Sequence, residues 1–236
     1  MYYIRYFLYL VVFTRCLFAI AGSYDDFFRA IQMDDSTTVR MLLVRGFDPN
    51  TPNSAGETGL IVAVREASLK AVSTLLEYPK VNVEARTRQD ESPLMLAALS
   101  GLTDLCRRLI ALGADVNKPG WTPLHYAATN GHLTTMELLL EAHAYIDATS
   151  PNGTTPLMMA AHYGTPAAVK LLLDGDADPG LKNEQGLSAI DFAQRASRVD
   201  AAEMIAAAIR GRQPKCQAIG DSVTEGDANQ RVKDCW

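Results

Sequence analysis

The sequence predicts an all-α repeat solenoid, and three observations support this fold class. A short phrase of the type Thr-Pro-Leu recurs at intervals of 30 to 34 residues. Small residues, a break and a second apolar stretch ending in a leucine pair follow most copies. A helix pair of this size cannot bury its own apolar face, so consecutive units must stack around one continuous core.

The recurring phrase predicts where each unit begins. A Thr or Ser at its first position can cap free backbone N–H groups with the side-chain hydroxyl. Proline next occupies the first helical position, where its missing N–H costs nothing. We expect Asp25 to cap the first helix in the same way. The units start near Asp25, Thr58, Ser92, Thr122, Thr155 and Ser188.

These units resemble the ankyrin repeat. The copy that starts at Gly120 reads Gly-Trp-Thr-Pro-Leu-His-Tyr-Ala-Ala-Thr-Asn-Gly-His, and six copies in register cover residues 24–211. The resemblance implies six stacked ankyrin repeats, each a helix-turn-helix unit, joined by β-hairpin finger loops. It also implies a structural role for one phrase, whose His bonds back toward the Thr hydroxyl. The residues of that phrase are Thr122, Pro123, Leu124 and His125.

Departures from the repeat predict local features. Gly101, Gly131 and Gly164 are expected to end first helices in a left-handed conformation. Asp90 and His143 stand where the repeat has Gly, and both residue types tolerate positive φ.

The connection at residues 117–121 is three residues shorter than its equivalents. It predicts a truncated finger loop and a local break in the row of fingers. The shortened finger should also leave the ring of Trp121 less covered.

The two ends of the chain differ from the repeats. Arg5, the apolar stretch 6–21 and Ala19-Ile-Ala21 are typical of a signal peptide, which assigns residues 1–21 to export. An uncleaved membrane anchor is the alternative, and Arg15 weakens both interpretations. A cleaved signal would place the protein in the periplasm of a Gram-negative bacterium, or outside the cell. Residues 212–236 show no period and are interpreted as an irregular tail.

Charge and cysteine usage exclude several classes. With 22 basic and 27 acidic side chains, the net charge of −5 argues against a binder of nucleic acid or anionic membrane. Removing residues 1–21 leaves 20 basic side chains against 27 acidic ones. Cys106 aligns with Met136 and Val169, so we expect it to be buried. Cys216 and Cys235 in the tail form a disulfide or remain free thiols.

No catalytic constellation is found in the sequence. His162 lies beside Tyr163 at a variable position, where an exposed contact is favoured over a general base. No Ser or Cys forms a nucleophile motif with a histidine. His-x3-His and Cys-x2-Cys metal spacings and a Gly-rich phosphate loop are also missing. We therefore expect a non-enzyme with no metal, no cofactor and no small-molecule substrate.

The resemblance implies protein binding through the finger loops and the exposed side of the first helices. Trp121 is the preferred anchor, although its ring could instead pack on the neighbouring finger. Arg86 and Arg88 could steer an acidic partner, or form a solvated charged loop. The full candidate set is Arg65, Glu66, Arg86, Arg88, Gln89, Glu91, Trp121, Thr129, Asn130, Asn152, Thr154, His162, Tyr163, Glu184, Gln185 and Arg195.

Four functions stay open at this stage. The leading hypothesis is an exported, non-enzymatic scaffold that binds a protein partner through its concave face. The second is an inhibitor or immunity protein that neutralises a toxin or enzyme in the same compartment. The others are an enzyme with an unrecognised site and a membrane-tethered adaptor. Because one repeat scaffold serves unrelated ligands, the fold does not name the partner.

Overall fold

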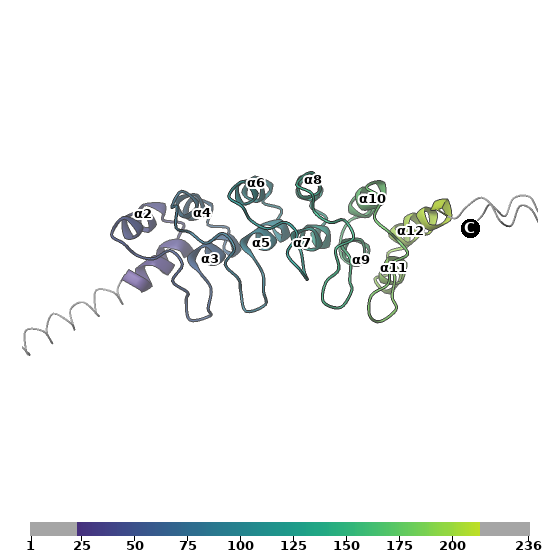
Figure 1. The fold of residues 1–236 in the computed structure, drawn as a ribbon, viewed down its shortest axis with the longest axis horizontal. Coiled ribbons are helices and arrows are strands. Elements are labelled where there is room, and N and C mark those ends of the chain that lie inside the picture. The colour runs from purple at the N-terminus through teal and green to yellow at the C-terminus, as the bar shows by residue number, and fades with distance from the viewer. Residues whose placement is uncertain (1–22, 213–236) are drawn as a thin grey trace, which may run out of the picture.

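The computed structural model describes residues 23–212, which form an elongated row of six helix pairs (Figure 1). The predicted signal peptide, Cys216 and Cys235 lie outside these residues. A helical segment at residues 23–32 precedes the labelled helices. These are α2 (Ser36–Val44), α3 (Gly59–Arg65), α4 (Leu69–Leu76), α5 (Pro93–Leu99), α6 (Thr103–Ala111), α7 (Pro123–Asn130), α8 (Leu133–Glu141), α9 (Pro156–His162), α10 (Pro166–Asp174), α11 (Ala189–Arg195) and α12 (Val199–Arg212).

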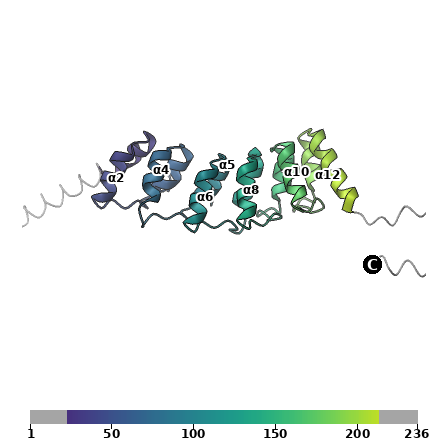
Figure 2. The same cartoon turned by 90° about the horizontal axis from the view of Figure 1, so that it is seen from above.

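The helices form two parallel rows, which confirms the predicted all-α repeat solenoid. In the first row α5 contacts α7, α7 contacts α9 and α9 contacts α11. The second row holds α4, α6, α8 and α10 and lies along the other side of the stack (Figures 1 and 2). The loops between pairs project from the first row as fingers. Between residues 23 and 212 the structure has no helix long and apolar enough to cross a membrane.

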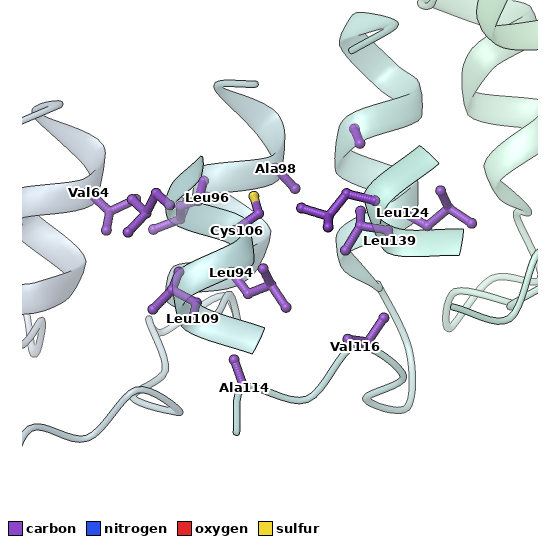
Figure 3. Close-up of a cluster of buried hydrophobic side chains, with 14 of the residues drawn as sticks. Val64, Leu94, Leu96, Ala98, Cys106, Leu109, Ala114, Val116, Leu124 and Leu139 are labelled. Carbon is purple, nitrogen blue, oxygen red and sulfur yellow. The ribbon is translucent and has the colours of Figure 1, made fainter. Parts of the chain in front are cut away.

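The core runs along the whole row because each repeat contributes the same positions. Leu94, Leu124 and Leu157, the third residues of their phrases, are fully buried. Figure 3 shows Leu94 and Leu124 in this layer together with Cys106. Cys106 and its equivalents Met136 and Val169 are all fully buried, as predicted. Burial raises the pKa of the Cys106 thiol to about 12, so this thiol is inert while the stack is folded.

Hydroxyl capping is present in some repeats and not in others. The Ser92 hydroxyl accepts from the backbone N–H of Met95 at 3.2 Å, and the Thr155 hydroxyl accepts from that of Met158 at 3.3 Å. The Thr58 hydroxyl is buried without a hydrogen-bond partner in the described residues. The prediction that Asp25 caps the first helix is wrong, because Asp25 lies inside the helical segment 23–32.

Glycine ends two of the three first helices as expected. Gly101 and Gly131 have φ values of 66° and 67°. The prediction of a left-handed Gly164 is wrong, since its φ is not positive. A Cβ at Gly164 would lie 2.4 Å from the backbone oxygen of Ala128. This glycine is needed for close approach of α7 and α9.

Four fingers share one closing bond, and the third finger lacks it. Each of the four has a backbone N–H that donates to the carbonyl four residues later: Asn53 to Glu57, Thr87 to Glu91, Ser150 to Thr154 and Asn183 to Leu187. No such bond occurs in residues 117–121, which confirms the truncated finger. There the Lys118 amino group pairs with Asp90 of the preceding finger. Asp90 and His143 have φ values of 64° and 63°, as predicted.

The fingers are hairpin turns rather than a sheet. Among the residues described, the bridge between Lys182 and Ser188 is isolated and belongs to no longer strand.

Candidate functional site

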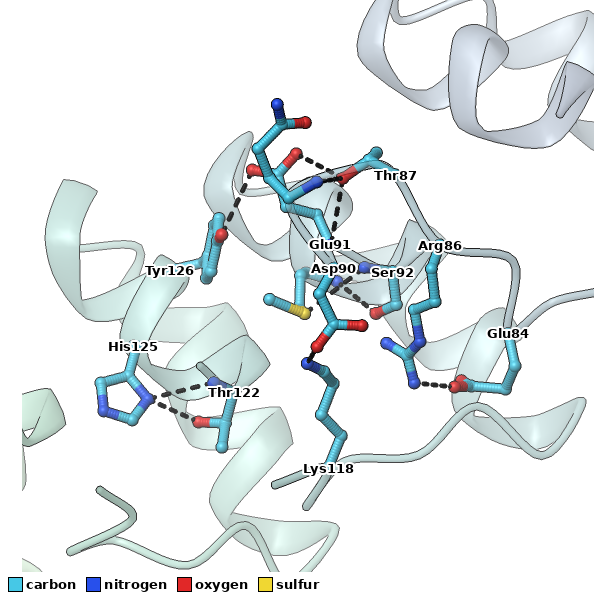
Figure 4. Close-up of polar contacts among 12 residues, drawn as sticks. Glu84, Arg86, Thr87, Asp90, Glu91, Ser92, Lys118, Thr122, His125 and Tyr126 are labelled. Carbon is cyan, nitrogen blue, oxygen red and sulfur yellow. Dashed lines mark hydrogen bonds and ion pairs between the residues drawn. The ribbon is translucent and has the colours of Figure 1, made fainter. Parts of the chain in front are cut away.

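His125 joins its own helix to the next finger. Its Nδ1 accepts from the Thr122 backbone N–H at 3.2 Å and lies 2.9 Å from the Thr122 hydroxyl (Figure 4). Its Nε2 lies 2.9 Å from the Thr154 carbonyl, which can only accept, so Nε2 carries the proton. Burial lowers the pKa of His125 to about 4, so the ring is neutral at pH 7. The bond to Thr122 that the resemblance implied is therefore present.

A charged cluster lies at the bases of the fingers between the second and fourth repeats. The Glu91 carboxylate accepts from the Thr87 hydroxyl at 3.1 Å and from the Tyr126 hydroxyl at 3.2 Å (Figure 4). The Arg65 guanidinium pairs with Glu57 and lies 3.9 Å from Glu91. We call these five residues the finger-base network. Burial, followed by the nearby Glu91 charge, raises the pKa of Tyr126.

The basic residues of the second finger also have partners within the stack. Arg86 pairs with Glu84, two residues earlier (Figure 4). Arg88 donates to the Ser54 carbonyl of the first finger at 3.4 Å. Gln89 is exposed at the fingertip. Arg88 thus helps to hold the first finger, whereas Arg86 pairs within its own loop, and both bonds reduce what the arginines can offer a partner.

In the fourth repeat, two candidate side chains donate hydrogen bonds to backbone carbonyl groups. The Thr129 hydroxyl donates to the His125 carbonyl at 2.8 Å, within the same helix. The Asn130 side-chain amide donates to the Leu99 carbonyl at 2.8 Å and so ties α7 to the end of α5. Glu66, beyond the end of α3, is exposed.

The structure brings seven of the candidates to one concave cavity of about 270 Å³. We call it the aromatic hollow. It lies between the fourth, fifth and sixth repeats. Its lining consists of Trp121, Asn152, Thr154, Met159, His162, Tyr163, Asn183, Gln185, Leu187, Phe192 and Arg195.

Sequence reasoning did not select Met159, Asn183, Leu187 or Phe192. The repeat register could have found one of them, because Leu187 occupies in its own repeat the position of the candidates Trp121 and Thr154. Met159 and Phe192 likewise share one repeat position.

Aromatic rings form the walls of the hollow. Contacts with neighbouring rings and a hydrogen bond to a backbone carbonyl hold them in place. The Trp121 ring stands edge-on to His125, with centroids 5.2 Å apart. The His162 ring packs against Tyr163 at 4.2 Å and against Phe192 at 6.0 Å. His162 Nδ1 lies 3.1 Å from the Phe192 carbonyl, to which it donates. Tyr163 is 59% exposed, so the hollow opens to solvent beside it.

Polar residues form the rim. The backbone N–H of Glu184 donates to the Asn152 carbonyl at 3.0 Å, which fixes the fourth finger against the fifth. The side chains of Glu184 and Gln185 are exposed on the fifth finger. Arg195 ends α11, is exposed, and has no hydrogen bond or ion pair with any residue of the described range. Residues 23–212 contain no group of three or more metal-ligating side chains that could hold an ion.

The comparison with protein families decides the family. The model for ankyrin repeats matches three times, over residues 27–119, 81–150 and 124–217. This chain belongs to the ankyrin repeat family. Members of this family are typically non-catalytic modules for protein–protein interaction.

Two solved bacterial structures resemble this ankyrin repeat chain over most of its length. One is a chain in the complex of the predatory endopeptidase Bd0816 from Bdellovibrio bacteriovorus with the immunity protein Bd3460. It is 31% identical, has a TM-score of 0.67, and the match covers 77% of this chain and 97% of that chain. The other is the ankyrin repeat domain ABAYE2397 from Acinetobacter baumannii, with 25% identity, a TM-score of 0.67, and coverages of 77% and 96%.

Curated relatives match this chain over part of their own, much longer chains. The tyrosine-protein kinase Shark of Drosophila melanogaster is 29% identical over 76% of this chain. The B-cell lymphoma 3 protein homolog of Mus musculus is 30% identical over 61% of this chain. The matches span 20% and 34% of those proteins, so this chain corresponds to about a third of their length or less.

Proposed function

We propose that this chain is a non-enzymatic ankyrin scaffold that binds a protein partner through the aromatic hollow and the fingers beside it. One observation supports this most directly. The hollow gathers Trp121, Tyr163 and Arg195, which forms no ion pair within residues 23–212, in one concave place on the stack. Trp, Tyr and Arg are the residue types that most often dominate the energy of protein interfaces. Six other candidates are engaged in bonds within the chain, namely Arg65, Arg86, Arg88, Glu91, Thr129 and Asn130.

The geometry of His162 favours binding over catalysis. Its Nδ1 donates to a backbone carbonyl, and its ring is packed between Tyr163 and Phe192. A general base in a Ser- or Cys-type mechanism would hydrogen-bond a nucleophile instead. His162 therefore serves best as part of the wall.

Affinity capture with matched variants tests the proposal. The hollow variant combines Trp121→Ala, His162→Ala and Tyr163→Ala. The control combines Arg107→Ala, Glu137→Ala and Lys170→Ala, three exposed residues of the second helix row. We expect wild type and control to retain the same protein from periplasmic extract, and the hollow variant to retain about tenfold less, because several anchors are lost together. Equal capture by all three proteins, with intact unfolding curves, would contradict the assignment.

We further propose that the chain is exported and acts in the periplasm. Support comes from the apolar stretch 6–21 with Arg5 before it and small residues at its end. Intact-mass measurement of the protein isolated from its host tests this. Loss of residues 1–21 is expected, whereas a full-length membrane-bound form would favour the tethered alternative.

A second candidate function is an inhibitor or immunity protein that neutralises an enzyme of the same compartment. The observation that favours it is the similarity to a chain from a complex of an endopeptidase with an immunity protein. The test is to purify the captured partner and titrate it with this chain. One-to-one binding that abolishes the partner's enzymatic activity supports inhibition. Weak binding to several unrelated partners would refute it.

A further inference from the structure

We infer that the aromatic hollow takes one apolar side chain, preferably aromatic, from a partner segment in which an acidic residue follows directly. This inference rests on the proposed protein-binding function and names the chemistry that the partner presents. Three properties support it: the size of the hollow, the charge at its edge, and the free amides on its rim.

The size of the hollow fits a single side chain. Its volume of about 270 Å³ lies below the roughly 300–1,000 Å³ of pockets that enclose drug-sized ligands. The walls are the rings of Trp121, Tyr163 and Phe192, and Met159 and Leu187 add apolar surface. An aromatic ring inserted here could meet these walls in the edge-to-face arrangement that aromatic pairs prefer.

The lining of the hollow bears charge of one sign. Of all the lining residues, Arg195 alone bears a permanent charge, and it makes no ion pair within the described part of the chain. A planar guanidinium binds a carboxylate through two parallel hydrogen bonds. Charge complementarity therefore favours a carboxylate next to the inserted side chain and disfavours a lysine or arginine there.

The rim offers polar groups for the backbone of the same segment. The Asn152 side-chain oxygen accepts from the Ser150 hydroxyl at 2.5 Å, and the NH₂ group of this exposed residue makes no hydrogen bond within residues 23–212. The Gln185 side chain is exposed, while its backbone N–H is fixed by Asn183 at 3.0 Å. An extended segment crossing the rim would find both a donor and an acceptor there.

The equivalent places in earlier repeats lack this combination. Arg65 occupies the repeat position of Arg195, but its charge is neutralised by Glu57. Leu99, Thr129 and His162 occupy the same position in the three repeats between, and none of them is an arginine. The unpaired guanidinium beside an aromatic cavity is thus specific to the last repeats.

Titration with short peptides tests the inference. The probes are three acetylated and amidated hexapeptides with the central pairs Phe-Asp, Phe-Lys and Ala-Asp between glycines. Binding is followed by NMR through the Trp121 indole signal, which is assigned by its loss in Trp121→Phe. We expect the Phe-Asp peptide to bind about threefold to fivefold more tightly than Phe-Lys, the range of a solvent-accessible ion pair. We expect no saturable shift with Ala-Asp.

The Arg195→Gln variant makes the result decisive. Because Arg195 is exposed at the end of α11, its removal should leave the folded spectrum unchanged. The preference for Phe-Asp over Phe-Lys should then disappear. Equal affinities in wild type, a preference that survives in Arg195→Gln, or no saturable shift up to about 5 mM peptide would each overturn the inference.

The outcome is separable from that of the capture experiment. Capture that depends on the hollow, without a Phe-Asp preference, refutes this inference alone. A Phe-Asp preference without any captured protein refutes the proposed function and leaves the chemistry of the hollow standing.

Discussion

The concave face has two halves that share the same repeat scaffold. They differ in whether their polar and aromatic side chains are bonded within the chain or open to solvent. In the second to fourth repeats the finger-base network uses its charged and hydroxyl groups on one another. In the fourth to sixth repeats the aromatic hollow leaves rings, amides and a guanidinium open to solvent. The first half adds cohesion between neighbouring repeats, and the second half can make its contacts with another molecule.

Two pairs of equivalent positions explain the difference. Arg65 and Arg195 both stand seven residues after the first residue of their phrases, yet among residues 23–212 only Arg65 forms an ion pair with a carboxylate. Tyr126 and Phe192 share another position, and the Tyr126 hydroxyl bonds to Glu91, whereas Phe192 has no hydroxyl to bond. Binding capacity in this stack therefore depends on what the neighbouring repeat leaves unpaired.

The largest effect on stability should come from disrupting the close approach of α7 and α9, the helices next to the hollow. Gly164→Ala would place a Cβ 2.4 Å from the Ala128 oxygen and 2.9 Å from the Ala160 Cα. Both are backbone atoms that cannot rotate away. We expect α7 and α9 to move apart, and the free energy of unfolding to fall by about 3 kcal/mol. Urea denaturation measures this change.

Gly211→Ala is the matched control for that substitution. Gly211 lies in α12, and a Cβ there meets nothing within 4 Å. The same chemical change should be neutral or raise stability by up to about 1 kcal/mol. Comparable destabilisation by both substitutions would show that the helix contact at Gly164 is not special.

A second effect comes from His125, which lies at the boundary of the two halves. Its pKa is about 4 in the folded chain because of burial, against 6.5 for an ordinary histidine. The unfolded chain therefore binds the proton first, so the stabilisation is complete above pH 6.5 and declines as the pH falls toward 4. We expect unfolding free energy to drop by about 2 kcal/mol between pH 7.5 and pH 5.

Denaturant titrations at the two pH values measure this loss, and NMR of the imidazole signals identifies its source. The His125 ring should stay neutral at pH 5 in the folded protein. A His125 signal that titrates near pH 6.5, or a stability that does not change, would contradict the role assigned to burial.

The smallest expected effect tests whether the finger-base network stabilises the stack without taking part in partner binding. Glu91→Ala removes the acceptor of the Thr87 and Tyr126 hydroxyls, and we expect it to lower the free energy of unfolding by about 1 kcal/mol. Capture through the hollow should not change. Glu66→Ala, at an exposed site nearby, is the control and should stay within about 0.5 kcal/mol. A loss of capture in Glu91→Ala would mean that the two halves act together.

The fold could be predicted from sequence because its signals are local and repeated. Variants of the Thr-Pro-Leu phrase mark five helix starts, at Thr58, Ser92, Thr122, Thr155 and Ser188, so a weak copy is corrected by the others. The errors arose where one local signal permits two structures. A glycine serves both positive φ and close approach, since both need the absence of a Cβ, so Gly164 could not be assigned from its own neighbours. Asp25 lies in the unit with the weakest phrase, where the register alone placed the helix start.

The candidate site was predictable only as a set of positions. The repeat register identifies residues on the concave side, and seven of them do line the hollow. Whether a given arginine is paired depends on a carboxylate supplied by another part of the fold, as Glu57 is for Arg65. That pairing is a property of three-dimensional contacts, and no motif encodes it.

The short third finger shows which part of an ankyrin stack can change in length during evolution. Its loop has lost three residues, yet α5 and α7 still contact each other, as do α7 and α9. Fingertip length is therefore uncoupled from helix register. Insertions and deletions at the tips can reshape the recognition surface while the helical stack keeps its spacing, so that evolution can vary the partner of this chain without first having to rebuild its fold.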